Sequence, residues 1–101
     1  MAVATTHEAF SENLNTKFLL RTSDSSCLEV DLVKVSELLR SPGQERFSIL
    51  FRGPEETPLP QAMYEFQHEK MGKFDLFIVP INRDQDGTYY EAVFNRFAQA
   101  D

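Results

Sequence analysis

The sequence predicts a mainly β fold, a small antiparallel barrel or roll of about six strands with one short N-terminal helix. Apolar and polar residues alternate with a period of two in several short runs from Thr16 onward, as they do in half-buried strands. Only a few turn-forming residues separate these runs, which is typical of antiparallel hairpins. The chain also contains nine Phe and three Tyr but no Trp, and such rings fill the interior of a curled sheet well.

The length of the chain, 101 residues, fits a single domain over 1–101. We expect a short helix over 6–14 and a β body over 16–96. The same alternation is also compatible with a sandwich of two sheets, which is the close alternative to a barrel.

The helix over 6–14 is predicted from its cap and from its apolar spacing. Thr6 is a suitable N-cap and is followed by acidic residues in the first turns. Phe10 and Leu14 are four residues apart, so both are expected on the face that packs against the β body. The helix would then close one open end of the barrel, with His7 exposed in its first turn.

The β body begins with a predicted hairpin. Its strands cover 16–22 and 27–35, and the turn over 23–26 consists of Ser and Asp, whose side chains bond to their own backbone. The apolar residues of the second strand change parity after Leu32. A bulge or a strong bend near Leu32–Val33 would keep them pointing inward.

The middle of the chain contains one clear strand between two irregular segments. Residues 36–40 fit no single structure, and one helical turn is possible there, ended by Pro42 and Gly43. A strand over 45–52 follows. Its inward face consists of Phe47, Ile49 and Phe51. Residues 53–60 include three prolines, which lack backbone donors, so this segment is expected to be a surface loop.

The last three predicted strands cover 62–69, 74–81 and 88–95. Tyr64, Phe66 and His68 share one face of the first, and Tyr90, Ala92 and Phe94 share one face of the last. The strand over 74–81 is apolar on both parities, so we expect both of its sides to be covered. Asp86 and Gly87 form the dipeptide that predicts a hairpin turn before the final strand.

Four stretches in the second half of the chain occur in a characteristic order. They are FSILFRGP over 47–54, LPQAMY over 59–64 followed by His68, GKFDLFIVPI over 72–81 and DGTYYEAVFN over 86–95. Together they resemble a family of small bacterial domains of unknown function, with YEAVFN as the most specific part. Where that family usually has Gly before the Tyr strand, this chain has Ala62. The resemblance implies a compact β domain and implies no activity or cofactor.

The composition excludes several classes of protein. The formal net charge is −6, and an acidic surface repels nucleic-acid phosphates. The ten Lys and Arg are scattered singly, so we expect neither nucleic acid nor a membrane as a partner. Cys27 is the only cysteine, which rules out an internal disulfide and a zinc site built from cysteines. The N-terminus does not resemble a secretory signal, so the expected location is the cytoplasm.

His68 is the titratable residue with the most interesting position. At the inward parity of its strand it would serve as a general base or ligand with Glu69, Glu91 or Asp75. The simpler interpretation, which we favour, is a half-buried histidine bonded to a backbone carbonyl. His7 is far from His68 in the sequence, and the pair has no metal-ligand spacing.

Two further patterns are weak. Cys27 would need a base and a lowered pKa to act as a nucleophile, and no motif supplies either. Asp84, Asp86 and Gly87 are similar to part of a calcium loop, but the twelve-residue ligand pattern and its closing Glu are missing. No metal, cofactor or catalytic residue is therefore predicted.

The last strand offers a candidate binding surface. An outward Tyr89 with Glu91 and Arg52 would form a docking site, because Tyr and Arg are enriched in binding hot spots. In the alternative interpretation Tyr90 and Phe94 are core residues, and Glu91 is partly buried beside a basic neighbour such as Arg52.

These observations favour a non-enzymatic module for protein interaction or assembly, with a protein partner or self-association. A second hypothesis is a small-molecule binder or small enzyme that uses the open mouth of the barrel, with His68, Tyr90 and Glu91 as its polar groups. A third is a structural subunit of a phage-tail-like particle.

Overall fold

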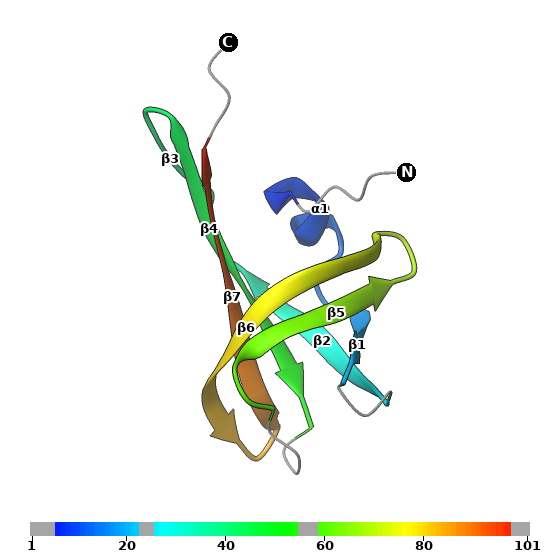
Figure 1. Cartoon of the computed structure of the whole chain (residues 1–101). Coiled ribbons are helices and arrows are strands. Elements are labelled where there is room, and N and C mark those ends of the chain that lie inside the picture. Colours follow the sequence, from blue (N-terminus) through cyan, green and yellow to red (C-terminus); the bar gives the residue numbers. More distant parts are fainter. Residues whose placement is uncertain (1–5, 23–25, 55–58, 98–101) are drawn as a thin grey trace.

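The computed structural model of the chain describes residues 6–22, 26–54 and 59–97 (Figure 1). Within these ranges one helix, α1 (His7–Glu12), precedes seven strands. The strands are β1 (Lys17–Arg21), β2 (Cys27–Val35), β3 (Leu39–Ser41), β4 (Gln44–Gly53), β5 (Ala62–His68), β6 (Gly72–Asp84) and β7 (Gly87–Phe97).

The strands form one antiparallel sheet that closes on itself. Their order is β2-β1-β5-β6-β7-β4-β3, and β2 also pairs with β4. This second pairing runs from Asp31 opposite Arg52 to Val35 opposite Ile49. Six strands therefore make a closed barrel, and β3 is an extra strand beside one end of β4. The predicted antiparallel barrel with a short N-terminal helix is confirmed, and the two-sheet sandwich is not the arrangement found.

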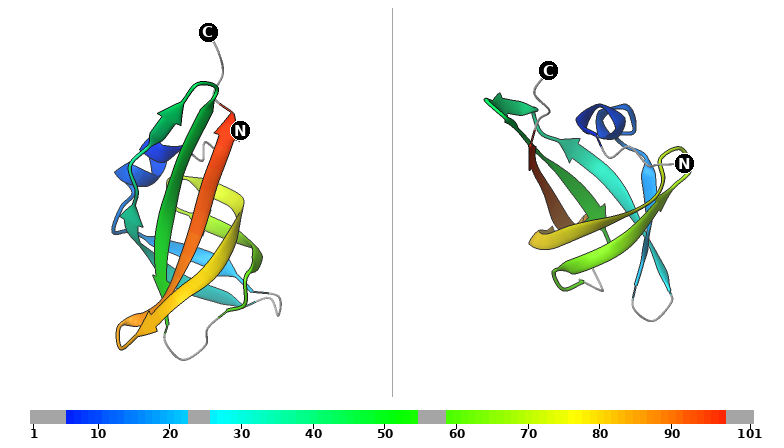
Figure 2. Two further views of the ribbon diagram at one scale, coloured as in Figure 1. Left: turned by 90° about the vertical axis from the view of Figure 1, so that its left-hand side faces the viewer. Right: turned by 45° about the horizontal axis from the view of Figure 1, so that its top comes forward.

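Two long strands change partners where the barrel bends (Figure 2). β2 pairs with β1 up to Asp31 and with β4 from Asp31 onward, and its register shifts between Leu32 and Lys34. β6 pairs with β5 up to Ile78 and with β7 from Val79 onward, with a shift after Pro80. Bulges of this kind bend a strand and increase its twist. The irregularity predicted near Leu32–Val33 is therefore present, and it helps to close the barrel.

The core is built from inward side chains of all six barrel strands, with Phe10 of α1 added at one end. The Thr6 hydroxyl accepts a hydrogen bond from the Ala9 amide and caps the helix. The Phe10 ring is fully buried and lies within 6.4 Å, centroid to centroid, of four other rings. These belong to Phe18, Phe47, Phe74 and Phe94. In Figure 1, α1 lies between the β3–β4 hairpin and the β5–β6 hairpin. The helix thus closes one end of the barrel, as expected.

Two predictions about the N-terminal segment are wrong. Leu14 lies beyond the end of α1 and is 39% exposed, because the helix ends at Glu12 before it can present a second apolar residue. His7 is half-buried instead of exposed. Its Nε2 lies 2.7 Å from the Ser36 carbonyl oxygen, and its ring meets Phe47 edge-on.

Two predictions about the β body also need correction. No helical turn forms over 36–40, since Leu39–Ser41 is the short strand β3, which pairs with the start of β4. The strand over 74–81 is covered on one side only. Phe74, Leu76 and Ile78 are buried, whereas Phe77 is 50% and Ile81 51% exposed on the other side. The apolar residues on the outward side of this strand therefore form an exposed apolar surface, and no other described element covers them.

Candidate functional site

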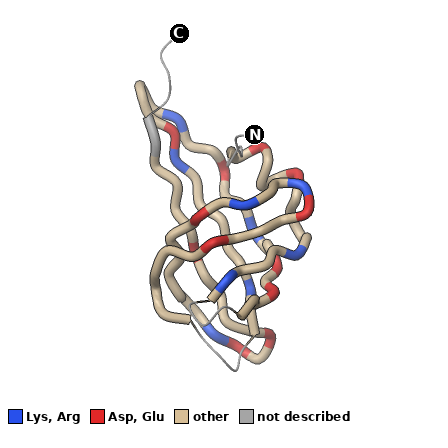
Figure 3. The backbone as a smooth tube through the Cα atoms, turned by 45° about the vertical axis from the view of Figure 1, so that its right-hand side comes forward, with Lys and Arg blue, Asp and Glu red and all other residues tan. Residues whose placement is uncertain are grey.

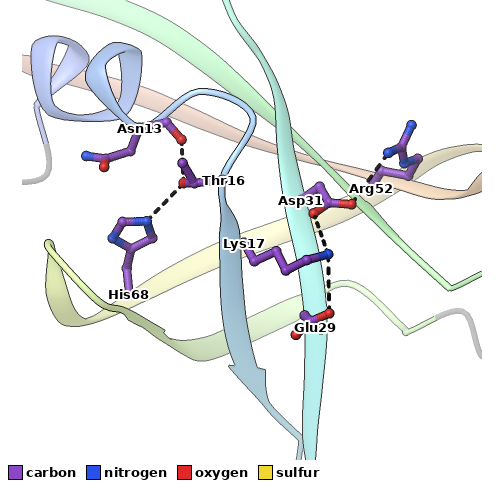
Figure 4. Close-up of polar contacts among 7 residues, drawn as sticks. All are labelled: Asn13, Thr16, Lys17, Glu29, Asp31, Arg52 and His68. Carbon is purple, nitrogen blue, oxygen red and sulfur yellow. Dashed lines mark hydrogen bonds and ion pairs between the residues drawn. The ribbon is translucent and has the colours of Figure 1, made fainter.

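His68 stands at the end of β5, where its ring is buried against Phe18 at a centroid distance of 4.2 Å. Its Nδ1 accepts backbone hydrogen bonds from Lys70 at 3.0 Å and Met71 at 3.2 Å. Its Nε2 lies 2.9 Å from the Thr16 hydroxyl, which in turn donates to the Asn13 carbonyl at 2.6 Å (Figure 4). The ring thus connects the β5–β6 turn to the segment that joins α1 to β1.

These contacts determine the protonation state of His68. Because Nδ1 accepts two N–H groups and the Thr16 proton is used on Asn13, Nε2 must carry the proton and donate to Thr16. Burial lowers the pKa of His68, and Lys70 lowers it further against the opposite effect of Glu69. The ring is therefore a neutral structural residue. The sequence argument correctly placed it inward, but its backbone partners are amide groups and not a carbonyl.

Arg52 lies in a row of charged side chains on the outside of β1, β2, β4 and β7. It stands opposite Asp31 on one side and Tyr89 on the other, and its guanidinium lies 3.4 Å from the Asp31 carboxylate. Lys17 continues the row, at 3.4 Å from Asp31 and 3.3 Å from Glu29 (Figure 4). The interaction with Tyr89 is the main cause that raises the pKa of Arg52, and Asp31 also raises it. This row is exposed at Lys17 and Glu29 and half-buried at Asp31 and Arg52, and its charges are paired within the chain.

Tyr90 points into the barrel and is fully buried. Its hydroxyl accepts a hydrogen bond from the Leu59 amide at 2.8 Å. Tyr90 is therefore a core residue, as the alternative interpretation of the last strand predicts. Its hydroxyl also anchors the chain just before β5.

Glu91 faces outward between Leu50 on β4 and Val79 on β6. It is half-buried, as expected for the acid of the last strand. Its neighbour is Leu50, however, and not Arg52, which is one outward position further along β4. Among the described residues no hydrogen-bond or ion-pair partner of the Glu91 carboxylate is found.

Glu91 stands where two adjoining hollows meet, with volumes of about 400 and 170 Å³. Ser36 and Ser48 also line both, and their backbone and side-chain hydrogen bonds of 2.8 Å hold the end of β2 beside β4. We call the surface around them the β4–β7 face. It comprises Lys34, Leu39, Arg46, Ser48, Leu50, Ile81, Glu91 and Val93.

The β4–β7 face combines exposed apolar side chains with charges. Leu39 is 58%, Val93 56% and Ile81 51% exposed. Like Glu91, Arg46 has no ion-pair partner within the described ranges. On the other side of the barrel, basic and acidic residues are interspersed along the strands (Figure 3). Lys34 stands opposite Leu50, lines the smaller hollow with Glu91 and also has no ion-pair partner within the described ranges. The face is thus an apolar surface with one carboxylate, one guanidinium and one ammonium group available for another molecule.

The structure brings only some of the predicted site residues together. Arg52 and Tyr89 are cross-strand neighbours, and Glu91 follows Tyr89 on the same side of β7. His68 and Tyr90 point into the barrel, and neither lines the hollows beside Glu91. Sequence reasoning missed Leu39, Leu50 and Ile81. The second apolar parity of 74–81 was the available signal, but it was interpreted as burial.

The described ranges contain neither a metal-ligand cluster nor a membrane-spanning helix. No group of three His, Cys, Asp or Glu side chains there is placed to hold a metal ion. No helix in the same ranges is long and apolar enough to cross a membrane.

The fold and these side chains define a small antiparallel β-barrel closed at one end by a helix, with an apolar outer face around a half-buried carboxylate. A family model covers nearly all of this barrel, with a match over residues 5–94. The chain therefore belongs to the family described as a domain of unknown function, DUF6916. No curated protein and no solved structure matched the chain in the other two comparisons.

Proposed function

We propose that this protein is a non-enzymatic interaction module that binds another protein chain through the β4–β7 face. The observation that carries the proposal is the grouping of Leu39, Ile81 and Val93, each more than half exposed, around the hollows that meet at Glu91. Apolar patches bordered by polar groups are typical of protein-binding surfaces.

The position of the polar groups supports binding over catalysis. His68 is engaged through both ring nitrogens, and the Tyr90 hydroxyl accepts from Leu59 inside the barrel. A general base must reach its substrate within hydrogen-bond distance or through one water. The barrel-mouth hypothesis needs His68, Tyr90 and Glu91 to converge, and Glu91 faces the opposite side of the barrel wall.

Site-specific photo-crosslinking tests the proposal. Val93 is replaced by the photoreactive residue benzoylphenylalanine, and the protein is expressed and irradiated in the organism that encodes it. Lys73 provides the matched control, because it is an exposed outward residue on the far part of β6. We expect a covalent protein adduct from position 93 and little from position 73. Absence of an adduct at 93, or equal adducts at both positions, would contradict the proposal.

A further inference from the structure

The partner that the β4–β7 face fits is a second copy of the same chain. We propose that two copies associate face to face about a two-fold axis that passes between Ser48 and Val93 and is inclined to the line that joins them. This inference rests on the proposed function and specifies its partner. It is derived from the strand register and from Arg46 and Glu91, two of the three charged residues on this face that have no described ion-pair partner.

The register places the two charges symmetrically. Ser48 is opposite Val93, Arg46 is opposite Asn95, and Leu50 is opposite Glu91. Arg46 therefore lies two residues from Ser48 in one direction along the sheet, and Glu91 lies two residues from Val93 in the other. Each is displaced by about 7 Å along the strands. Figure 2 (left) shows β4 and β7 side by side along this face, with β3 beside one end of β4.

A two-fold axis in the plane of this face makes the surface complementary to itself. Because the axis is inclined, the strands of the two copies cross, and the Glu91 part of β7 in one copy lies over the Arg46 part of β4 in the other. Glu91 of each copy then faces Arg46 of the other, so that one dimer contains two such ion pairs. Val93 lies near the axis and packs against its own counterpart.

The apolar side chains follow the same symmetry. Leu39 on β3 is opposite Arg46, on the outer side of β4, and Leu50 lies on the other side of Ser48. Leu50 of one copy therefore packs over the Leu39 region of the other. A dimer of this kind buries the exposed Leu39 and Val93 and gives Arg46 and Glu91 a partner.

Sedimentation velocity over chain concentrations from about 1 to 500 µM, a range that covers micromolar dissociation constants, tests the inference. We expect a concentration-dependent dimer of the unmodified chain. Arg46→Glu and Glu91→Arg should each weaken it about tenfold or more by placing like charges together. An equimolar mixture of the two variants should dimerise again, because each contact then joins opposite charges. The double variant Arg46→Glu/Glu91→Arg should also dimerise. Lys73→Glu and Asp75→Arg on the outside of β6 are the controls and should leave the dimer unchanged.

The outcomes separate this inference from the proposed function. A monomer at every concentration, or a dimer that persists in both single variants, overturns the two-fold arrangement. If the crosslink at position 93 then joins a different protein, the interaction module stands and only the self-association is wrong. If Glu91→Arg does not fold, the exposed Leu39→Asp and Arg46→Glu test the same face, and an unchanged dimer in both overturns the inference.

Discussion

The Nε2 of His68 lies 2.9 Å from the hydroxyl of Thr16, and through this contact the end of β5 is tied to the segment that follows α1. The partners on both ring nitrogens require the neutral form of the imidazole. The barrel and the helix that closes it are therefore joined by an imidazole that keeps these contacts only while it is neutral.

We predict that the protein loses stability as the pH falls below about 6.5. The pKa of His68 is lowered from its ordinary value of 6.5, mainly by burial. Above pH 6.5 the ring is neutral in both the folded and the unfolded chain, so its contribution to the free energy of unfolding is constant. Below 6.5 the unfolded chain takes up the proton first, and stability falls until the pH passes the folded-state pKa. Urea unfolding at pH 7.5 and 5.5 should show a larger loss for the wild type than for His68→Gln. Equal losses would mean that the folded ring is not held neutral.

We predict that Phe10→Ala destabilises the protein by about 3–5 kcal/mol. The ring is fully buried and contacts rings from β1, β4, β6 and β7, so its removal leaves a cavity beneath α1. Leu14→Ala is the control, since Leu14 is more exposed and should cost less than about 1 kcal/mol. Similar losses in the two variants, measured by chemical denaturation, would show that α1 does not seal the core.

Gly87→Ala should be among the most damaging small substitutions. Gly87 has φ +149°, and a Cβ there would lie 2.2 Å from the Gly53 carbonyl oxygen. Backbone strain and overpacking together predict a loss of about 3 kcal/mol or more. Gly43 also has a positive φ, +79°, but no atom within 4 Å of its Cβ position, so Gly43→Ala carries only the conformational cost, about 1 kcal/mol. A comparison of melting temperatures separates the two, and equal shifts would be inconsistent with the close approach of β7 to β4.

Tyr90→Phe should cost about 1–3 kcal/mol, because it leaves the amide of Leu59 without its acceptor beside the core. Tyr64 offers a matched comparison. Its hydroxyl donates to the Pro60 carbonyl at an exposed position, where water can replace it. Tyr64→Phe should therefore lose less than Tyr90→Phe in the same unfolding assay. The reverse order would show that the Leu59 contact contributes less to stability than the exposed Pro60 contact.

The inward side chains of several barrel strands could be predicted from the sequence. Alternation with a period of two shows which side chains share a face of a strand. The inward orientation of Phe66, His68, Tyr90 and Ala92 could therefore be predicted from the sequence, and all four are buried. The bulge after Leu32 was also visible, because a change of parity within an apolar strand requires one extra residue. The family resemblance agreed with the fold but carried no activity.

The outer face could not be predicted in the same way. An apolar residue on the outward parity is compatible with burial under another element or with exposure, and the sequence contains no local signal that distinguishes them. Phe77 and Ile81 were expected to be covered and are half exposed. Leu39 was expected in an irregular segment and belongs to a strand beside β4.

The sequence by itself determined the type of each main element, the inward set of side chains and the local hairpins, because these depend on periodicity and turn chemistry over a few residues. Only the tertiary structure decided that β2 pairs with β4, that Arg52 meets Asp31, and that Glu91 stands half-buried between apolar neighbours. Those contacts join strands far apart in the chain. Their register follows from how the whole barrel closes, which no local pattern of residues specifies.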